Sequence, residues 1–224
     1  ADWMCMLVNT DSASTNKHLN KSLICVPLKE DGKRVKGVTI NRKLKKLGMN
    51  SSDTAEIFFD DVRVPTKNLI GEEGQGFVYQ MMQFQEERLY AAIGNYAGCE
   101  LAIAETIEYT RQRKTFGKAI NQHQVIAFKL ADMATDIEAA RLLVQKSAYE
   151  KDNHESYGLS SSMAKLYASE MAMKHTVEAV QIHGGYGFVK EYHVERLMRD
   201  AKITQIYEGT SEIQKIIISR SLLK

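Results

Sequence analysis

The sequence predicts an α+β fold that is mainly α, with part of an antiparallel β-domain in residues 1–73 and a helical bundle domain in residues 74–224. Short β-prone runs separated by turn residues fill the first part. Helical periodicity dominates after residue 73. Both prolines, Pro27 and Pro65, lie in the first part, so no helix interior has to accommodate them.

Four β-prone runs predict the strands of the β-domain. They cover residues 3–8, 23–26, 35–40 and 56–64, and Pro27 and Pro65 close the second and the fourth. Asp31-Gly32 has the residue types of a tight turn between neighbouring strands. Four strands alone leave unpaired sheet edges, which stable proteins usually avoid, so we expect further strands upstream of Ala1.

Helical patterns predict the second domain, which begins after a flexible junction at residues 71–76. Long helices are expected over 77–112, 122–150 and 157–183, and shorter ones near 191–201 and 211–222. Gly184-Gly185 should stop the third helix. Short connections between long helices favour an antiparallel bundle.

Two apolar stripes define the expected inner faces of the second and third long helices. The second carries Ile126, Leu130, Met133, Ile137, Ala140, Val144 and Ala148. The third carries Leu159, Met163, Leu166, Met173, Val177 and Val180.

Composition excludes several classes of protein. The hydrophobic and charged fractions, 44% and 26% of the 224 residues, are ordinary for a globular chain. A net charge of +2 without a dense basic block argues against nucleic acid. Three widely spaced cysteines without a C-x-x-C motif predict no disulfide framework and a reducing, intracellular setting. No apolar run reaches the length of a membrane span.

No metal site is predicted, because no two histidines stand at i, i+4 and no H-E-x-x-H motif occurs. The chain also has no P-loop, G-x-G-x-x-G or G-x-S-x-G motif. The glycine-rich run at 183–187 follows a helix rather than a strand, and its plain interpretation is a helix stop.

The segment 207–214 is the most informative candidate site. Ser211 and Gln214 have the spacing of a capping box at the start of the last helix. Glu208 precedes this helix start, and a carboxylate in an apolar pocket has a raised pKa and can act as a general base. A surface glutamate favoured by the helix dipole is the alternative.

Two charged clusters are further candidates. Residues 111–118 end a long helix, where cations suit the helix dipole, but an arginine and a threonine there can also bind a pyrophosphate. In residues 85–89, Glu87 and Arg88 point about 100° apart, so at least one is expected to face inward or into a cleft. An exposed charged face is the alternative.

Taken together, these segments resemble the acyl-CoA dehydrogenase family over essentially the whole chain. Residues 48–54, 59–65 and 71–77 are similar to the family's β-domain and its junction. The helical part matches in family order at Arg113-Lys114-Thr115-Phe116-Gly117-Lys118, Gln181-Ile182-His183-Gly184-Gly185-Tyr186-Gly187, Met198-Arg199-Asp200-Ala201-Lys202 and Tyr207-Glu208-Gly209-Thr210-Ser211-Glu212.

The resemblance implies a flavoprotein that uses FAD to oxidise acyl-CoA thioesters to trans-2-enoyl-CoA, in fatty-acid β-oxidation or branched-chain acyl-CoA oxidation. It implies an N-terminal helical domain and a middle β-domain before a four-helix-bundle-type domain. It also implies a homotetramer or homodimer that passes electrons to electron-transferring flavoprotein. The mitochondrial matrix would be the location in a eukaryote and the cytoplasm in a bacterium.

The resemblance also assigns residue roles. Glu208 matches the catalytic base, and the substrate would contact Gln85, Arg88, Tyr207 and Gly209. FAD would contact Arg113, Thr115, His123, Gln124, Gln181, Gly184, Gly185, Thr210 and Glu212, with Arg113 and Thr115 often reaching across a subunit boundary.

Two aspects of the resemblance leave alternatives open. Some members carry the base on the long helix, at the position of Glu87, and this chain has a glutamate at both positions. Segments of the family's enzymes that would precede Ala1 are not in the sequence, so we expect the isolated chain to be inactive. A catalytically inactive helical assembly module and an acyl-CoA oxidase are the competing functions.

Overall fold

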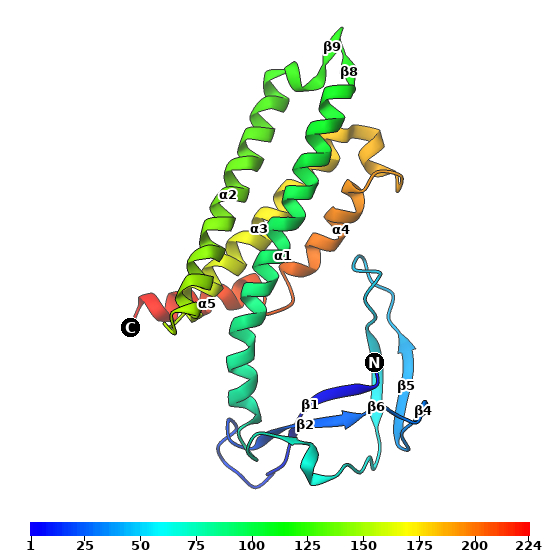
Figure 1. Cartoon of the computed structure of the whole chain (residues 1–224), viewed down its shortest axis with the longest axis vertical. Coiled ribbons are helices and arrows are strands. Elements are labelled where there is room, and N and C mark those ends of the chain that lie inside the picture. Colours follow the sequence, from blue (N-terminus) through cyan, green and yellow to red (C-terminus); the bar gives the residue numbers. More distant parts are fainter. The chain divides into compact units, whose positions relative to one another are not determined.

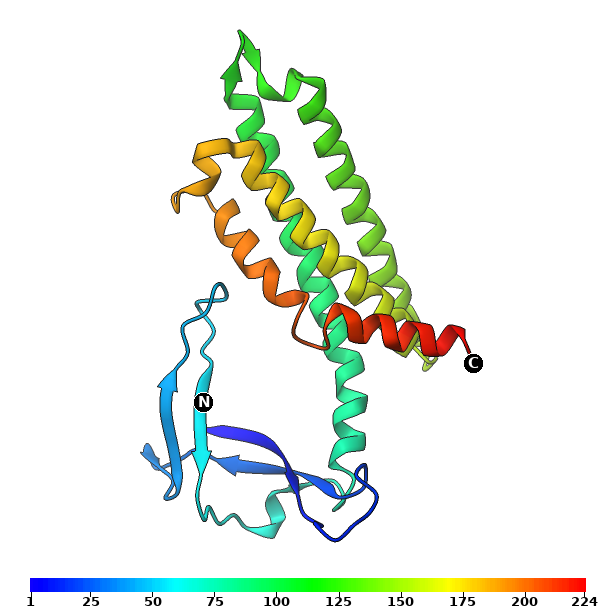
Figure 2. The same ribbon diagram turned by 180° about the vertical axis from the view of Figure 1, so that it is seen from behind.

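The computed structural model describes all 224 residues and divides into two compact units. Unit 1 comprises residues 1–46 and 50–84, and unit 2 comprises residues 47–49 and 85–224. Unit 1 contains the larger strands and unit 2 a bundle of helices (Figures 1 and 2), which confirms an α+β fold that is mainly α. The division falls inside α1 (Gly76–Gln112), whose first turns belong to unit 1.

The first sheet of unit 1 is antiparallel, with the strand order β1-β2-β7. It consists of β1 (Trp3–Asn9), β2 (Lys21–Pro27) and the short β7 (Leu69–Ile70), which follows a 3-10 turn at Thr66–Asn68. Trp3 stands opposite Pro27, and Asn9 stands opposite Lys21. The central strand, β2, buries Leu23 and Val26. The first two predicted strands are therefore confirmed.

A short hairpin follows β2 and contains the predicted Asp31-Gly32 turn. β3 (Lys29–Glu30) pairs with β4 (Lys33–Arg34), and Glu30 stands opposite Lys33. Asp31 and Gly32 have φ values of 49° and 76°, the left-handed pair that a two-residue hairpin turn requires. The turn prediction is confirmed.

Of the other two predicted strands, the third is shifted by three residues toward the C-terminus and the fourth ends five residues early. β5 (Val38–Lys43) pairs with β6 (Ala55–Phe59) in antiparallel fashion. The predicted start at residue 35 is wrong because the chain turns at Gly37, which has φ 87° and where a Cβ would lie 2.1 Å from the Asp60 carbonyl oxygen. The predicted end at residue 64 is wrong because Asp61, with φ 46°, breaks the extended conformation.

Unit 2 is built around α3 (Gly158–His183), which packs against α2 (Gln124–Asp152), α4 (Val194–Thr204) and α5 (Ser211–Leu222). A small hairpin of β8 (Lys114–Thr115) and β9 (Lys118–Ala119), then a 3-10 turn at Ile120–Gln122, connects α1 to α2. The five predicted helices are confirmed, and the fourth is shifted by three residues toward the C-terminus.

Helix α3 ends where the sequence predicts. Gly184 follows it with φ 61°, and a second 3-10 segment, Gly184–Phe188, turns the chain toward α4.

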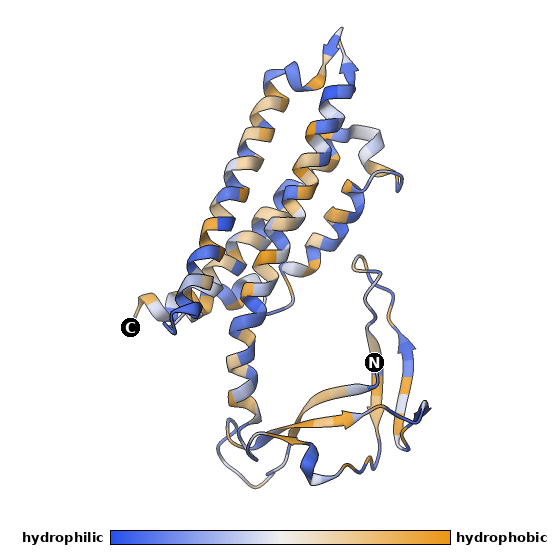
Figure 3. Cartoon of the chain, viewed as in Figure 1, coloured by the Kyte–Doolittle hydropathy of each residue, from blue (hydrophilic) through white to orange (hydrophobic).

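The predicted stripe of α2 is confirmed, whereas that of α3 is wrong. Met133, Ile137, Ala140 and Val144 of α2 are buried. The buried face of α3 consists mainly of alanines, serines and threonines, and Val177 from the predicted stripe is 43% exposed. Small side chains let three helices approach a central one closely, so α3 buries its small residues rather than its large ones. Much of α3 is accordingly pale in the hydropathy view (Figure 3).

Residues 47–49 belong to unit 2 because they contact α4. The Arg199 guanidinium donates to the Leu47 carbonyl oxygen at 3.1 Å, and the Met49 backbone N–H donates to the Asp200 carboxylate. A Cβ at Gly48 would lie 2.5 Å from the Arg199 carbonyl oxygen, so only glycine allows this approach.

Candidate active site

Glu208 lies in the loop that connects α4 to α5. It has φ 56°, and Gly209 after it has φ 86°, so two consecutive residues adopt the left-handed conformation. For a glutamate this conformation is strained by about 1 kcal/mol. Strain of this kind persists where surrounding contacts impose it, and it is often found at functional sites.

The start of α5 corrects the predicted capping box. The N-cap is Thr210, whose hydroxyl oxygen accepts from the Ile213 backbone N–H at 3.3 Å. Ser211 is inside the helix, and its hydroxyl donates to the Glu170 carboxylate at 2.5 Å. The prediction placed the cap one residue too late because Thr210 and Ser211 are both good capping residues, and only the backbone conformation distinguishes them.

Two buried side chains fix the Glu208 loop by hydrogen bonds to its carbonyl groups. The Gln214 side-chain amide donates to the carbonyl oxygens of Glu208, at 3.1 Å, and Gly209, at 2.9 Å. The Lys165 ammonium donates to the same Gly209 oxygen at 2.7 Å. Lys165 and Gln214 are both fully buried, so these bonds form away from water. Neither residue was identified from the sequence.

The carboxyl group of Glu208 forms a hydrogen bond with the carboxyl group of Glu87 from α1. Burial, this hydrogen bond and the charge of Glu87 together raise the pKa of Glu208 to about 7, while Lys165 and Arg88 oppose the rise. Two carboxyl groups can form such a bond only when one of them holds a proton. The structure therefore brings both predicted candidates for the base into one site, with a group that titrates near neutral pH.

Arg88 completes the cluster from α1. Its Nε is buried without a hydrogen-bond partner, and burial lowers the pKa of Arg88 against the opposing charges of Glu208 and Glu87. Glu87 and Arg88 are both half-buried. Glu86 is exposed and pairs with Lys151 at 3.1 Å. The alternative of an exposed charged face is therefore correct for Glu86 but not for Glu87 and Arg88.

An apolar cavity of about 390 Å³ adjoins this loop. Tyr207 contributes to the wall of this cavity, and burial raises the pKa of its hydroxyl group. Much of the remaining wall comes from small residues of α1, α3 and α4, including Ala91, Gly94, Gly98, Ala172 and Ala201. Gln85, the remaining predicted substrate residue, is half-buried, and its side-chain oxygen would lie 3.1 Å from a Cβ added at Gly158. Glu208 follows Tyr207 in the sequence, so a proton acceptor stands next to the wall of an apolar cavity, where such a group can remove a proton from a carbon acid.

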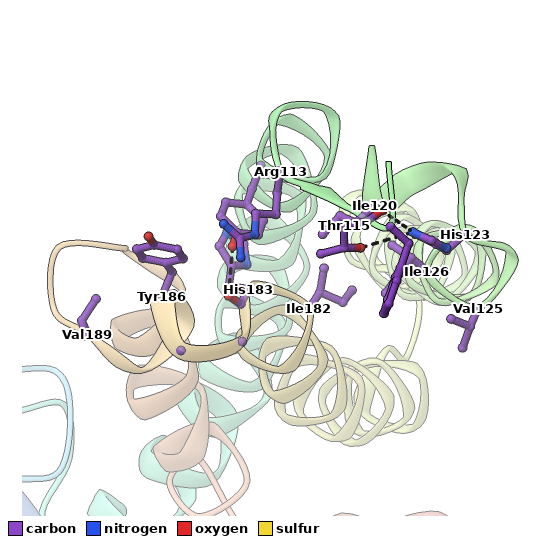
Figure 4. Close-up of a pocket in the computed structure, with 14 residues that line it drawn as sticks. Arg113, Thr115, Ile120, His123, Val125, Ile126, Ile182, His183, Tyr186 and Val189 are labelled. Atoms are coloured by element: carbon purple, nitrogen blue, oxygen red, sulfur yellow. Dashed lines mark hydrogen bonds between the residues drawn. The ribbon is translucent and has the colours of Figure 1, made fainter. Parts of the chain in front are cut away.

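A second and larger pocket, of about 800 Å³, lies where α1 and α3 end and α2 begins (Figure 4). Its wall includes five of the predicted FAD-binding residues, which are Arg113, Thr115, His123, Gly184 and Gly185. The remaining wall, not predicted from the sequence, comprises mainly aromatic and aliphatic side chains, including Tyr109, Phe116, Ile120, Ile182 and Tyr186.

Polar contacts order part of this larger pocket. The Thr115 hydroxyl lies 3.3 Å from His123 Nε2. Tyr109 stacks on the His183 ring, with 4.1 Å between the centroids, and donates to the His183 carbonyl oxygen at 3.1 Å. The Arg113 guanidinium lies 5.7 Å from the centroid of the Tyr186 ring. Figure 4 shows Arg113 and Tyr186 on one side of the pocket and Thr115 with His123 on the other.

The remaining predicted FAD-binding residues lie outside this pocket. Gln124 and Gln181 are exposed and are not part of its wall. Thr210 and Glu212 lie at the start of α5, beside the Glu208 loop. Along α3, Lys165 and His183 are separated by roughly 27 Å at about 1.5 Å per residue. One chain therefore presents two separate groups of predicted cofactor residues.

No group of three or more histidine, cysteine, aspartate or glutamate side chains lies where it could hold a metal ion. None of the helices has the length and apolar character needed to cross a membrane.

Comparison with known proteins gives consistent matches. The family described as "Acyl-CoA dehydrogenase, C-terminal domain" matches residues 74–223. A short-chain-specific acyl-CoA dehydrogenase of Megasphaera elsdenii is 45% identical over the whole chain, and an acyl-CoA dehydrogenase of Bacillus subtilis is 48% identical over 85% of it. The structure of butyryl-CoA dehydrogenase from Megasphaera elsdenii superposes with a TM-score of 0.93 at 42% identity, covering 100% of this chain and 57% of that one.

The chain spans only part of these relatives. It covers 57% of the length of the Megasphaera enzyme and 50% of the Bacillus enzyme.

Proposed function

Because this chain belongs to the acyl-CoA dehydrogenase family, we propose that the protein carrying it is an FAD-dependent enzyme that converts acyl-CoA thioesters into trans-2-enoyl-CoA. The observation that carries this proposal is the hydrogen-bonded pair of carboxyl groups at Glu208 and Glu87, where the residue before Glu208, Tyr207, lines an apolar cavity. We propose residues 1–73 as part of a β-domain and residues 74–224 as the helical domain. Alone, the chain is proposed to be inactive.

Glu208 is the proposed base, with Glu87 as the alternative. Its carboxylate takes the proton from the carbon next to the thioester carbonyl, and a pKa near 7 suits that step at neutral pH. FAD, when bound, would accept the hydride that leaves the next carbon. Loss of the proton and the hydride leaves a carbon–carbon double bond. Gln85, Arg88, Tyr207 and Gly209 are the proposed substrate contacts.

We propose that the larger pocket binds the pyrophosphate region of FAD. Arg113 offers a cation and Thr115 a hydroxyl, which suit phosphate oxygens. At Gly184 and Gly185, an added Cβ would meet no atom within 4 Å, so a ligand can approach this backbone closely. His123 and Gln124 at the start of α2, and Gln181 near the end of α3, are the other proposed contacts at this end.

We further propose that two copies of the chain complete each flavin site. Thr210 and Glu212 lie at the opposite end of α3 from Arg113 and Thr115, so both groups can contact one cofactor only if different copies supply them. A homodimer or a homotetramer would provide this arrangement.

The remaining assignments extend the same proposal. Electron-transferring flavoprotein would accept the electrons, and the pathway would be fatty-acid or branched-chain acyl-CoA oxidation. Location would be the mitochondrial matrix in a eukaryote or the cytoplasm in a bacterium. The similar structure named butyryl-CoA dehydrogenase makes butyryl-CoA the first substrate to test.

The test uses the full-length flavoprotein without oxygen, mixed with butyryl-CoA and longer or branched acyl-CoA thioesters. Loss of the flavin absorbance on mixing is the expected result. Glu208→Gln should slow this loss about 10³-fold while FAD stays bound. Glu87→Gln should still lose the flavin absorbance on mixing, with the base titrating at a lower pH, because the negative charge of Glu87 is removed.

Glu86→Gln is the matched control, because Glu86 is exposed and adjacent to Glu87 in sequence. Its variant should behave as the wild type does. If Glu87→Gln slows flavin bleaching strongly and Glu208→Gln changes its rate little, Glu87 is the base instead. No change in absorbance with any acyl-CoA would reject the proposed function.

Two competing functions have their own outcomes in the same experiments. Stoichiometric peroxide after oxygen is admitted would indicate an acyl-CoA oxidase. A stable oligomer in sedimentation that never takes up FAD would indicate a helical assembly module without catalysis.

A further inference from the structure

Lys165 is an unusual residue for the interior of a helical bundle. Its side chain is fully buried on the face of α3 formed mainly by alanines and serines. Lysine is rarely buried completely without a partner, because removing an ammonium from water is costly. Here the hydrogen bond from its Nζ goes to the Gly209 carbonyl oxygen, at 2.7 Å, rather than to a carboxylate. The buried charge therefore lies directly beneath the loop that carries Glu208.

The Gly209 oxygen accepts a second hydrogen bond from the neighbouring helix. Gln214 of α5 donates to it at 2.9 Å and to the Glu208 oxygen at 3.1 Å. A Cβ at Gly209 would lie 2.7 Å from this amide nitrogen. Donors from α3 and α5 thus fix the carbonyl groups of the two left-handed residues, one donor charged and the other neutral.

We propose that Lys165 is a positioning residue for Glu208. Its ammonium holds the Gly209 carbonyl so that the Glu208 carboxyl group meets Glu87, and its positive charge favours the ionised form of that carboxyl pair. This inference rests on the proposed function, in which Glu208 is the base. Gln214 has the holding role alone, because its amide carries no charge.

The electrostatic part of the proposal depends on every charged group around the loop. Burial lowers the pKa of Lys165 to about 8, and the charge of Arg88 adds to this effect. The negative charges of Glu208, Glu170 and Glu212 oppose it. Around Glu208, burial and Glu87 favour the protonated carboxyl group, whereas Lys165 and Arg88 favour the carboxylate. Lys165 therefore acts on Glu208 together with Arg88, and substituting one of them leaves the other.

Three variants of the full-length protein separate holding from charge. Lys165→Met removes both the donor and the charge at similar side-chain size. Lys165→Gln removes the charge and keeps an amide donor. Gln214→Leu removes the neutral donor and keeps the charge.

Two measurements made without substrate decide the proposal. Infrared difference spectra identify the Glu208 carboxyl band by its loss in Glu208→Gln and follow its titration. Amide hydrogen exchange reports on residues 207–210. Both lysine variants should raise the titration midpoint by about one pH unit, a tenfold change in the proton affinity of the pair. Gln214→Leu should leave the midpoint unchanged. Exchange should accelerate in Lys165→Met and Gln214→Leu, and much less in Lys165→Gln.

The rate of flavin bleaching supplies the third readout. In both lysine variants the acid limb of its pH profile should move upward with the titration midpoint, so the rate below the midpoint falls about tenfold. An unchanged midpoint and unchanged exchange in folded Lys165→Met, or in Lys165→Gln if the methionine variant does not fold, would overturn the proposal. If the wild type does not bleach at all, the proposed function fails, while the spectra and the exchange still decide the role of Lys165.

Discussion

The two ends of the helical unit differ in how they are built. At the Glu208 end, a strained loop is fixed by buried donors from α3 and α5 and faces a carboxylate from α1. At the Arg113 end, a two-residue hairpin turn leaves Phe116 96% exposed above a pocket lined mainly by aromatic and aliphatic side chains. The first end has the interactions needed to set the protonation of a catalytic group. The second has the room and the donors needed to bind a ligand, and its exposed apolar side chains suit cover by another molecule.

The largest expected effect would come from separating the two ends onto different chains. Glu208→Gln and Arg113→Ala should each give a nearly inactive full-length enzyme. If two copies share each site, mixed oligomers of the two variants contain some sites with both intact residues. Their activity should recover to about a quarter of the wild-type value for random dimers.

The control for this mixing experiment is a chain that carries both substitutions, which should stay inactive when it is mixed with either single variant, Glu208→Gln or Arg113→Ala. Native mass spectrometry would verify that mixed oligomers form. Mixed oligomers without recovered activity would contradict the proposal that the two ends meet across copies.

The glycines at the two ends offer a smaller and sharper comparison. Gly209 and Gly184 both have positive φ, so alanine is strained at each. At Gly209 the new Cβ also meets the Gln214 amide at 2.7 Å, whereas at Gly184 it meets nothing within 4 Å. Gly209→Ala should lower the free energy of unfolding by about 4 kcal/mol and Gly184→Ala, whose ψ of −135° is also unfavourable for alanine, by about 2 kcal/mol. Denaturant unfolding of the flavin-free full-length protein measures both, and equal losses would show that the Glu208 loop is not tightly held.

The smallest expected effect is a pH dependence of stability that belongs to one end only. The pKa of Glu208 is raised from 4.5 to about 7 in the folded protein. Its contribution to stability is therefore fully present below about pH 4.5 and is lost as the pH rises through about 7. Between pH 5 and 8, the free energy of unfolding of the wild type should fall by on the order of 1 kcal/mol more than that of Glu208→Gln, after allowance for partial exposure of the side chain.

Arg113→Ala serves as the control for that measurement, because it should follow the pH dependence of the wild type. The free energy of unfolding at several pH values gives the comparison. Parallel curves for the wild type and Glu208→Gln would mean that the Glu208 carboxyl group titrates in the folded protein as it does in the unfolded chain.

Local patterns predicted most of the elements well. The last helix was expected at 211–222 and is found there, because a capping residue and helical periodicity define it without reference to the rest of the chain. The Asp31-Gly32 turn is similarly local. The predicted stripe of α3 failed because it assumed that the largest apolar residues are buried. A helix surrounded by three others buries its smallest residues instead, so Ala164 and Ala168 are inside while Val177 is exposed.

The candidate site divides in the same way. The sequence alone determined the order of the elements, the resemblance to a family, and Glu208 and Glu87 as the two candidates for the base. Residue types and short-range spacing carry that information. Only the tertiary structure decided that Glu87, Lys165 and Glu208 meet at one loop, and that Arg113 lies at the other end of the bundle. These outcomes depend on how α1, α3 and α5 pack, and packing joins residues that no local pattern relates.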